Sequence, residues 1–62
     1  MIIDALQKKY EAEIAAAKAY IQVYMDNPAG IGEHPDLVSA VDSEMAKLAE
    51  AADKLETLMD KF

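Results

Sequence analysis

The sequence predicts an all-α protein: an antiparallel hairpin of two helices, over about residues 3–26 and 35–61, in one domain that spans residues 1–62. Three observations predict it. Apolar residues recur at intervals of three and four in two long segments. The two prolines and the two glycines of the chain all lie between those segments. Twelve of the 62 residues are alanine, the strongest helix former.

The first predicted helix has apolar side chains along one face and neither glycine nor proline in its interior. Asp4 precedes Lys8 by four residues, an orientation that favours a helix. We expect this helix to end near Asp26, because Pro28 disfavours the helical conformation of the residue before it. The apolar face consists of Ile3, Leu6, Tyr10, Ile14, Ala17, Ile21, Tyr24 and Met25.

The connection between the helices is about eight residues long, a length that lets two helices pack antiparallel. Gly30 and Gly32 permit positive φ angles, and Pro35 suits the first turn of the next helix. His34 is then the expected N-cap. Asp36 is favourable near the positive start of that helix.

The second predicted helix carries apolar residues in an unbroken alternation of three- and four-residue spacings, which is typical of a coiled-coil seam. We expect this seam to face the first helix. The two helices match in length, at about 36 and 40 Å, so they can pair end to end. The seam consists of Val38, Val41, Met45, Leu48, Ala52, Leu55, Met59 and Phe62.

Both helices carry more apolar surface than one neighbour covers. Leu37, Ala49, Ala51 and Leu58 widen the apolar arc of the second helix to about half of its circumference. The first helix has a second strip that is rich in small residues. Small apolar residues are also common on solvent-exposed helices, so this strip has two interpretations. It consists of Ala5, Ala12, Ala16, Ala19, Tyr20 and Val23.

The surplus apolar surface predicts a homodimer, in which two hairpins form a four-helix bundle. The alternatives are a monomer, whose apolar surface is left for a different protein partner, and an assembly of higher order. The residues expected at the dimer interface are Tyr10, Ile14, Ala16, Tyr20, Val23, Leu37, Val41, Met45, Leu48, Leu55, Leu58 and Met59.

The chain is acidic. Twelve acidic residues, six lysines and no arginine give a net charge of −6, which disfavours nucleic acid as a partner. The longest apolar run, residues 14–17, is far too short to span a bilayer, and we recognise no signal peptide. We therefore expect a cytoplasmic protein that does not bind membranes. The absence of cysteine and the single histidine exclude thiolate and multi-histidine metal sites.

The densest group of titratable residues is Glu33, His34 and Asp36, in the connection. Capping and turn formation explain these residue types without catalysis. We therefore predict no catalytic residue, no cofactor and no enzymatic activity. A weak cation site formed by Asp26, Glu33 and Asp36 stays open. The connection is also a candidate contact with a protein partner, through Gly30, Ile31, Gly32, Glu33, His34 and Asp36.

An acidic stripe follows the outer side of the second helix, at Asp42, Glu50, Asp53 and Asp60. Such a stripe is typical of a solvated face. It also allows an alternative function, in which the chain imitates the charge of nucleic acid and inhibits a host protein by occupying its basic groove.

The string DNPAGIGEHPD at residues 26–36, together with Asp53-Lys54-Leu55-Glu56, resembles short proteins of tailed marine bacteriophages along nearly the whole chain. The resemblance implies an accessory factor that is made in the cytoplasm of an infected bacterium and binds a host or phage protein.

In size and hairpin form the chain is also similar to the Rop family of plasmid regulators, which dimerise into four-helix bundles and bind RNA through a basic strip. Lys8, Lys9 and Lys18 here point about 80° to 180° apart around their helix. The likeness therefore implies an architecture, and a small RNA- or cation-binding module is the remaining alternative function.

Overall fold

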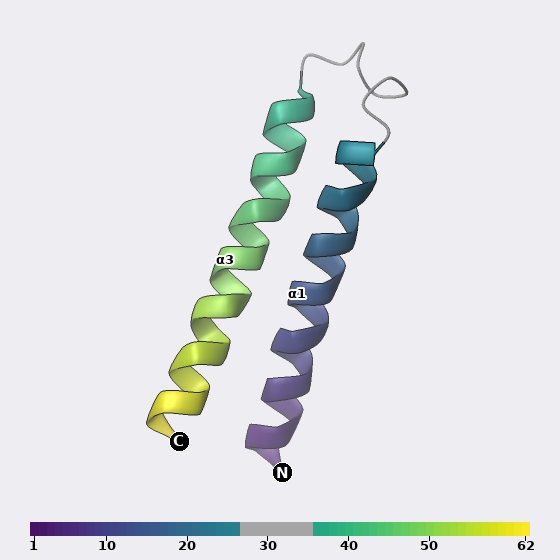
Figure 1. Cartoon of the computed structure of the whole chain (residues 1–62). Coiled ribbons are helices and arrows are strands. Elements are labelled where there is room, and N and C mark those ends of the chain that lie inside the picture. The colour runs from purple at the N-terminus through teal and green to yellow at the C-terminus, as the bar shows by residue number, and fades with distance from the viewer. Residues whose placement is uncertain (27–35) are drawn as a thin grey trace.

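Two long helices make up the part of the chain that the structure, a computed structural model, describes: residues 1–26 and 36–62. The helices α1 (Ile2–Asp26) and α3 (Leu37–Lys61) contain 25 residues each. They pack side by side in opposite directions, so the N- and C-termini lie at the same end (Figure 1). The predicted all-α hairpin is confirmed.

The start of α3 differs from the prediction. The helix begins at Leu37, and Asp36 is its N-cap, with φ −101° and ψ 17°. The carbonyl of Asp36 accepts the first helical hydrogen bond, from the N–H of Ala40 at 2.8 Å. The predicted N-cap at His34 is therefore wrong, and the helix starts two residues later than expected. The predicted conformations of Gly30, Gly32 and Pro35 lie outside the described residues.

The core is a single thin layer between the helices. Among the described residues, only Ala17, Ala51 and Leu58 are buried, with exposed fractions of 2%, 3% and 5%. Half-buried side chains continue this layer toward both ends. They are Leu6, Gln7, Tyr10, Ile14, Ile21 and Tyr24 on α1, and Leu37, Ala40, Val41, Glu44, Leu48 and Leu55 on α3.

The predicted apolar face of α1 is confirmed for the most part. Leu6, Tyr10, Ile14, Ala17, Ile21 and Tyr24 all lie in the core layer. Ile3 and Met25 do not, because both are classed with the exposed residues and Met25 is 65% exposed. The side of α1 that faces α3 is therefore narrower than the sequence pattern suggests.

Only three of the eight residues of the predicted seam of α3 are confirmed. Val41, Leu48 and Leu55 lie in the core layer, but the other five members are exposed. For four of these five residues, the residue one position earlier in the chain lies in the core layer instead: Leu37, Glu44, Ala51 and Leu58. Ala17 and Ala51 are both small and buried, so the two helices can pack closely at these residues. The face of α3 that contacts α1 is therefore centred closer to Ala51 than the seam pattern predicts. The exposed five are Val38, Met45, Ala52, Met59 and Phe62.

Candidate interaction surface

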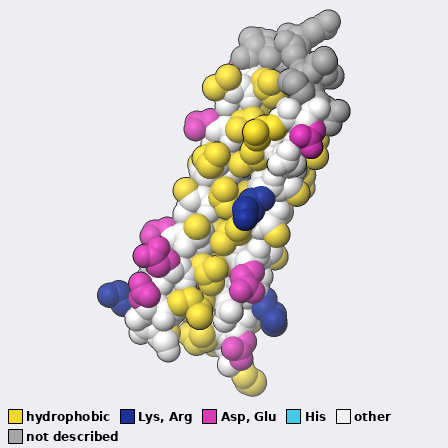
Figure 2. Space-filling model, in the orientation of Figure 1, with side chains coloured by type: hydrophobic (Ala, Val, Ile, Leu, Met, Phe, Trp, Pro, Cys, Tyr) yellow, Lys and Arg dark blue, Asp and Glu magenta, His cyan; other side chains and the backbone are white. Residues whose placement is uncertain are grey.

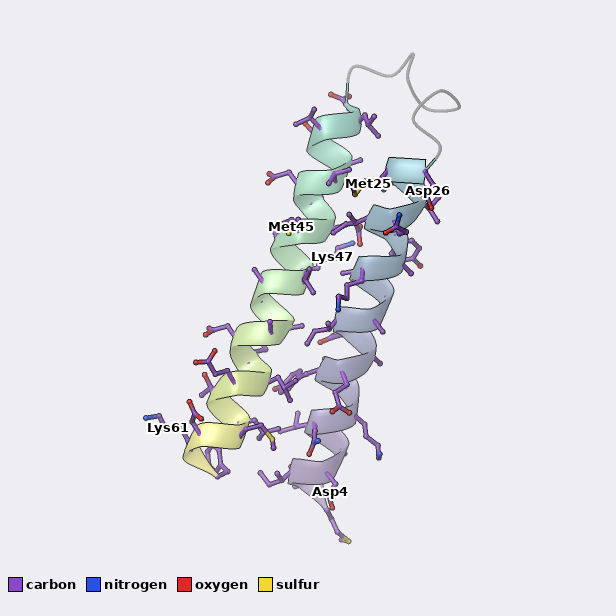
Figure 3. The ribbon with its side chains drawn as sticks, in the orientation of Figure 1. Asp4, Met25, Asp26, Met45, Lys47 and Lys61 are labelled. Atoms are coloured by element: carbon purple, nitrogen blue, oxygen red, sulfur yellow. The ribbon has the colours of Figure 1, made fainter. Side chains whose placement is uncertain are left out.

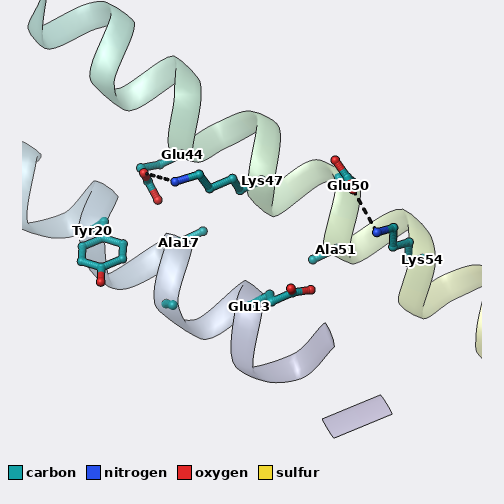
Figure 4. A pocket seen from close by; sticks show the side chains of 9 residues that line it. Glu13, Ala17, Tyr20, Glu44, Lys47, Glu50, Ala51 and Lys54 are labelled. Atoms are coloured by element: carbon teal, nitrogen blue, oxygen red, sulfur yellow. Dashed lines mark hydrogen bonds and ion pairs between the residues drawn. The ribbon is translucent and has the colours of Figure 1, made fainter. Parts of the chain in front are cut away.

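One broad side of the hairpin carries three ion pairs, each within a single helix. We name it the salt-bridged face, defined by its three lysine–glutamate pairs. A shallow groove of about 220 Å³ runs along it between the helices, and Ala16, Ala17, Tyr20 and Ala51 form the uncharged part of its lining (Figure 4). The pairs are Lys9–Glu13 at 2.9 Å, Lys47–Glu44 at 3.0 Å and Lys54–Glu50 at 2.9 Å.

A tyrosine links the two helices at one end of this groove. The ammonium groups of Lys9 and Lys54 lie 5.8 and 5.9 Å from the centroid of the Tyr10 ring. At this distance a cation is attracted to the electron-rich face of an aromatic ring. Because Lys54 belongs to α3 and Tyr10 to α1, the contact helps to set how far one helix is shifted along the other.

The hydrogen bonds of the salt-bridged face keep its charges in place. The bond from Lys54 to Glu50 raises the pKa of Lys54 and lowers the pKa of Glu50, and the bond from Lys47 to Glu44 raises the pKa of Lys47. Each shift favours the ionised form, so these groups stay charged at neutral pH. Catalytic acids and bases need pKa values close to the working pH instead.

The opposite broad side is apolar along α3. We name it the methionine face, defined by Val38, Met45, Ala52 and Met59 of α3 with Met25 of α1. The four residues on α3 are exposed and spaced by seven. Around the helix, Ala52 lies about +40° from the core residue Leu48, whereas Lys47 lies about −100° from it. The methionine face and the salt-bridged face therefore look in different directions.

Figure 2 shows hydrophobic side chains gathered in a band along both helices, with a lysine side chain near the middle of the band and acidic side chains at its margins. Near the start of α3 the surface forms an open apolar groove beside Val38, Val41 and Met45. Met25 and Met45 lie toward this same end of the hairpin (Figure 3). An apolar strip that continues along a helical rod is typical of a surface that contacts another protein.

The two helices contribute unequally to this side. The part of α1 beside the methionine face is polar apart from Met25, since it carries Gln7, Glu11, Lys18 and Gln22. Gln7 donates to Glu11 at 3.2 Å, and Gln22 donates to Asp26 at 2.8 Å. The apolar character of this side therefore comes chiefly from α3.

The predicted interface residues fall into three environments. Leu58 is buried within one hairpin, and six others are half-buried in the core layer: Tyr10, Ile14, Leu37, Val41, Leu48 and Leu55. Ala16, Tyr20, Val23, Met45 and Met59 are exposed. The predicted interface omitted Met25, Val38 and Ala52, which are exposed as well.

The second strip of α1 is exposed along its whole length: Ala5, Ala12, Ala16, Ala19, Tyr20 and Val23. The predicted acidic stripe is also exposed, and within it Glu50 is paired with Lys54. Exposure does not decide between the two interpretations of either feature. The second strip of α1 is still either an ordinary solvated surface or a contact with a neighbour, and the acidic stripe is still either a solvated face or an imitation of nucleic-acid charge.

Of the predicted partner-contact residues, Asp36 is exposed at the start of α3, whereas Gly30, Ile31, Gly32, Glu33 and His34 lie outside the described residues. The possible cation ligands Asp26 and Asp36 are described, and both are exposed. In residues 1–26 and 36–62, no three acidic or histidine side chains come together as metal ligands would. Neither described helix is long and apolar enough to cross a membrane.

Comparison of the chain with protein-family models, with curated proteins and with solved structures finds no match. The resemblances to bacteriophage proteins and to the Rop family stay predictions from the sequence.

Proposed function

We propose that this chain is a non-enzymatic protein that acts through protein–protein contact, and that it self-associates as a homodimeric four-helix bundle. One observation carries the proposal. Within the described residues, three side chains are buried, all of them alanine or leucine, while ten large hydrophobic side chains are exposed, among them Val38, Met45 and Met59.

Self-association would bury part of this exposed apolar surface. Burying a valine or methionine side chain contributes about 1.5–3 kcal/mol relative to leaving it in water. A chain of 62 residues has little other means of gaining stability, since its core is thin and it contains no cysteine for a disulfide. A second copy supplies apolar surface without any new sequence, and two-fold pairing closes the assembly.

The salt-bridged face supports a non-enzymatic role. Its lysines and glutamates pair with one another, and the pairing raises the pKa of Lys47 and of Lys54, which favours their charged forms. This arrangement stabilises a solvated surface and leaves Lys47 and Lys54 unsuited to proton transfer at neutral pH.

The proposed location is the cytoplasm of a bacterium infected by a bacteriophage. There the chain serves as an accessory factor that contacts a phage or host protein. The resemblance of residues 26–36 to bacteriophage proteins supports this part of the proposal.

Light scattering on a size-exclusion peak, repeated over a hundredfold range of protein concentration, tests the proposed self-association. The expected molar mass is twice the chain mass of 6.8 kDa, constant over the upper part of the range. A mass of one chain at every concentration contradicts the proposal.

A further inference from the structure

We infer that the second copy binds the methionine face with α3 packed antiparallel against the partner's α3, about a two-fold axis that passes level with Leu48 and Ala49. The N- and C-termini of one chain then lie at one end of the bundle, and those of its partner lie at the other end. The inference rests on the proposed self-association and adds its surface, register and topology.

The chemistry of the two sides selects the surface. On the salt-bridged face, Lys9, Lys47 and Lys54 each have a glutamate partner at 2.9–3.0 Å. Covering that face would remove three ion pairs from water, which is costly for charged groups. On the methionine face the exposed residues of α3 are apolar, so covering them with a second copy releases water from apolar surface.

The polarity of α1 selects the topology. If the two chains paired with their termini at the same end, α3 would lie against the partner's α1. Ala52 would then lie beside Lys18 and Met59 beside Glu11 of the polar stripe, and only Met45 would lie near an apolar residue of that α1, the partner's Met25. When α3 lies against the partner's α3, the apolar row meets its own copy and the polar stripes of α1 lie together at the margin.

The sizes of the side chains fit this register. Antiparallel pairing about the level of Leu48 and Ala49 places Met45 opposite the partner's Ala52, and Val38 opposite the partner's Met59. A long side chain therefore faces a short one at each contact. The centre of this row also coincides with the centre of α3, which runs from Leu37 to Lys61, so the helices overlap along their full length.

The area is sufficient for a stable dimer. Two helices of 25 residues, each about 37 Å long and about 10 Å wide, present a side of about 700 Å². Specific interfaces bury about 800 Å² per partner. The whole side of the hairpin, which includes the polar stripe of α1, thus has about the extent that a dimer interface needs.

A pair of matched variants tests the surface. Met45→Glu and Tyr20→Glu introduce the same charge at side chains of similar exposure, 47% and 57%, on the methionine face and the salt-bridged face. We expect Met45→Glu to weaken dimerisation at least a hundredfold, and Tyr20→Glu to change it less than threefold. The reverse order of effects overturns the inferred surface but leaves the proposed function intact.

Cysteine cross-linking tests the topology, and the chain suits it because it contains no cysteine of its own. Ala49 lies near the inferred axis on α3. Lys18 lies at a similar height on α1, because Ala17 and Ala51 line one groove. The experiment mixes equal amounts of the Ala49→Cys and Lys18→Cys proteins, oxidises them, and identifies the disulfide-linked products by intact mass.

The inferred topology predicts linked pairs of two Ala49→Cys chains and of two Lys18→Cys chains. A predominance of mixed pairs, one chain of each variant, means that α3 lies against the partner's α1 and overturns the inference. A dimer by light scattering in which neither kind of link forms also overturns it. A monomer by light scattering contradicts the proposed function itself, so the two failures are distinguishable.

Discussion

Two small residues determine how closely the helices approach. Ala17 and Ala51 line one groove and are 2% and 3% exposed, so nothing larger fits between the backbones without moving them. Extra methylene groups in a packed core force side-chain or backbone shifts.

The Ala17→Leu substitution is expected to destabilise the hairpin by about 1–3 kcal/mol, because the larger side chain pushes α3 away. Ala12→Leu is the matched control, since Ala12 is exposed on the same helix and leucine is a good helix former. Urea unfolding followed by circular dichroism measures both. Equal stability of the two variants contradicts the described packing.

The Glu50–Lys54 pair predicts a pH dependence. The folded state lowers the pKa of Glu50 from its ordinary 4.5, so the contribution of Glu50 is present above that pH and is lost as the pH falls through the lowered value. The folded state raises the pKa of Lys54 from its ordinary 10.5, so the contribution of Lys54 is present below that pH and is lost as the pH rises through the raised value.

The pair therefore stabilises the fold between these limits, by a small amount because both side chains are solvated. Glu50→Gln should lower the urea midpoint at neutral pH and leave it unchanged at about pH 2, where Glu50 is protonated. The same difference between wild type and variant at both pH values would show that the ion pair does not contribute.

At the scale of elements, α3 begins without help from a side chain. Asp36 occupies the N-cap, but its carboxylate makes no capping hydrogen bond. A residue that does make such a bond typically contributes about 1 kcal/mol. The stability of α3 therefore depends on its packing against α1.

Asp36→Ala is expected to cost less than about 0.5 kcal/mol, since only a favourable charge near the helix start is lost. Urea unfolding monitored by circular dichroism at 222 nm checks this. A loss of 1 kcal/mol or more would mean that the carboxylate of Asp36 caps the helix in solution.

At the scale of the whole molecule, charge opposes the proposed assembly. Each chain carries a net charge of −6, and the inferred register brings Asp42 near the partner's Glu56 and brings the two Lys18 side chains together. Exposed charge pairs are worth up to about 1 kcal/mol, less than the 1.5–3 kcal/mol or so per buried apolar side chain. Apolar contact should therefore prevail, with electrostatic repulsion reducing the affinity.

Added salt is accordingly expected to tighten the dimer, because it screens the repulsion between like charges. Sedimentation equilibrium at low and high sodium chloride measures the change in dissociation constant. A dimer that weakens with salt would indicate that ion pairs hold it. The alternative function as a nucleic-acid mimic makes the opposite prediction for its own complex, since binding to a basic groove weakens steeply with salt.

The sequence by itself determined the hairpin. Helical spacing, good helix formers and the clustering of Pro28, Gly30, Gly32 and Pro35 predicted two helices with the correct end of α1 and a start of α3 within two residues. These signals are local, because periodicity and turn chemistry depend on near neighbours in the chain.

Tertiary structure alone decided which apolar residues of α3 face α1. Val41, Leu48 and Leu55 have one apolar row on each side of them around the helix, one that contains Met45 and Met59 and one that contains Leu58. Either row would complete a coiled-coil seam. The close approach permitted by Ala17 and Ala51 favours the row that contains Leu58, which leaves Met45 and Met59 exposed. The sequence could not predict this choice, because it depends on how two helices fit together and not on the pattern of either one.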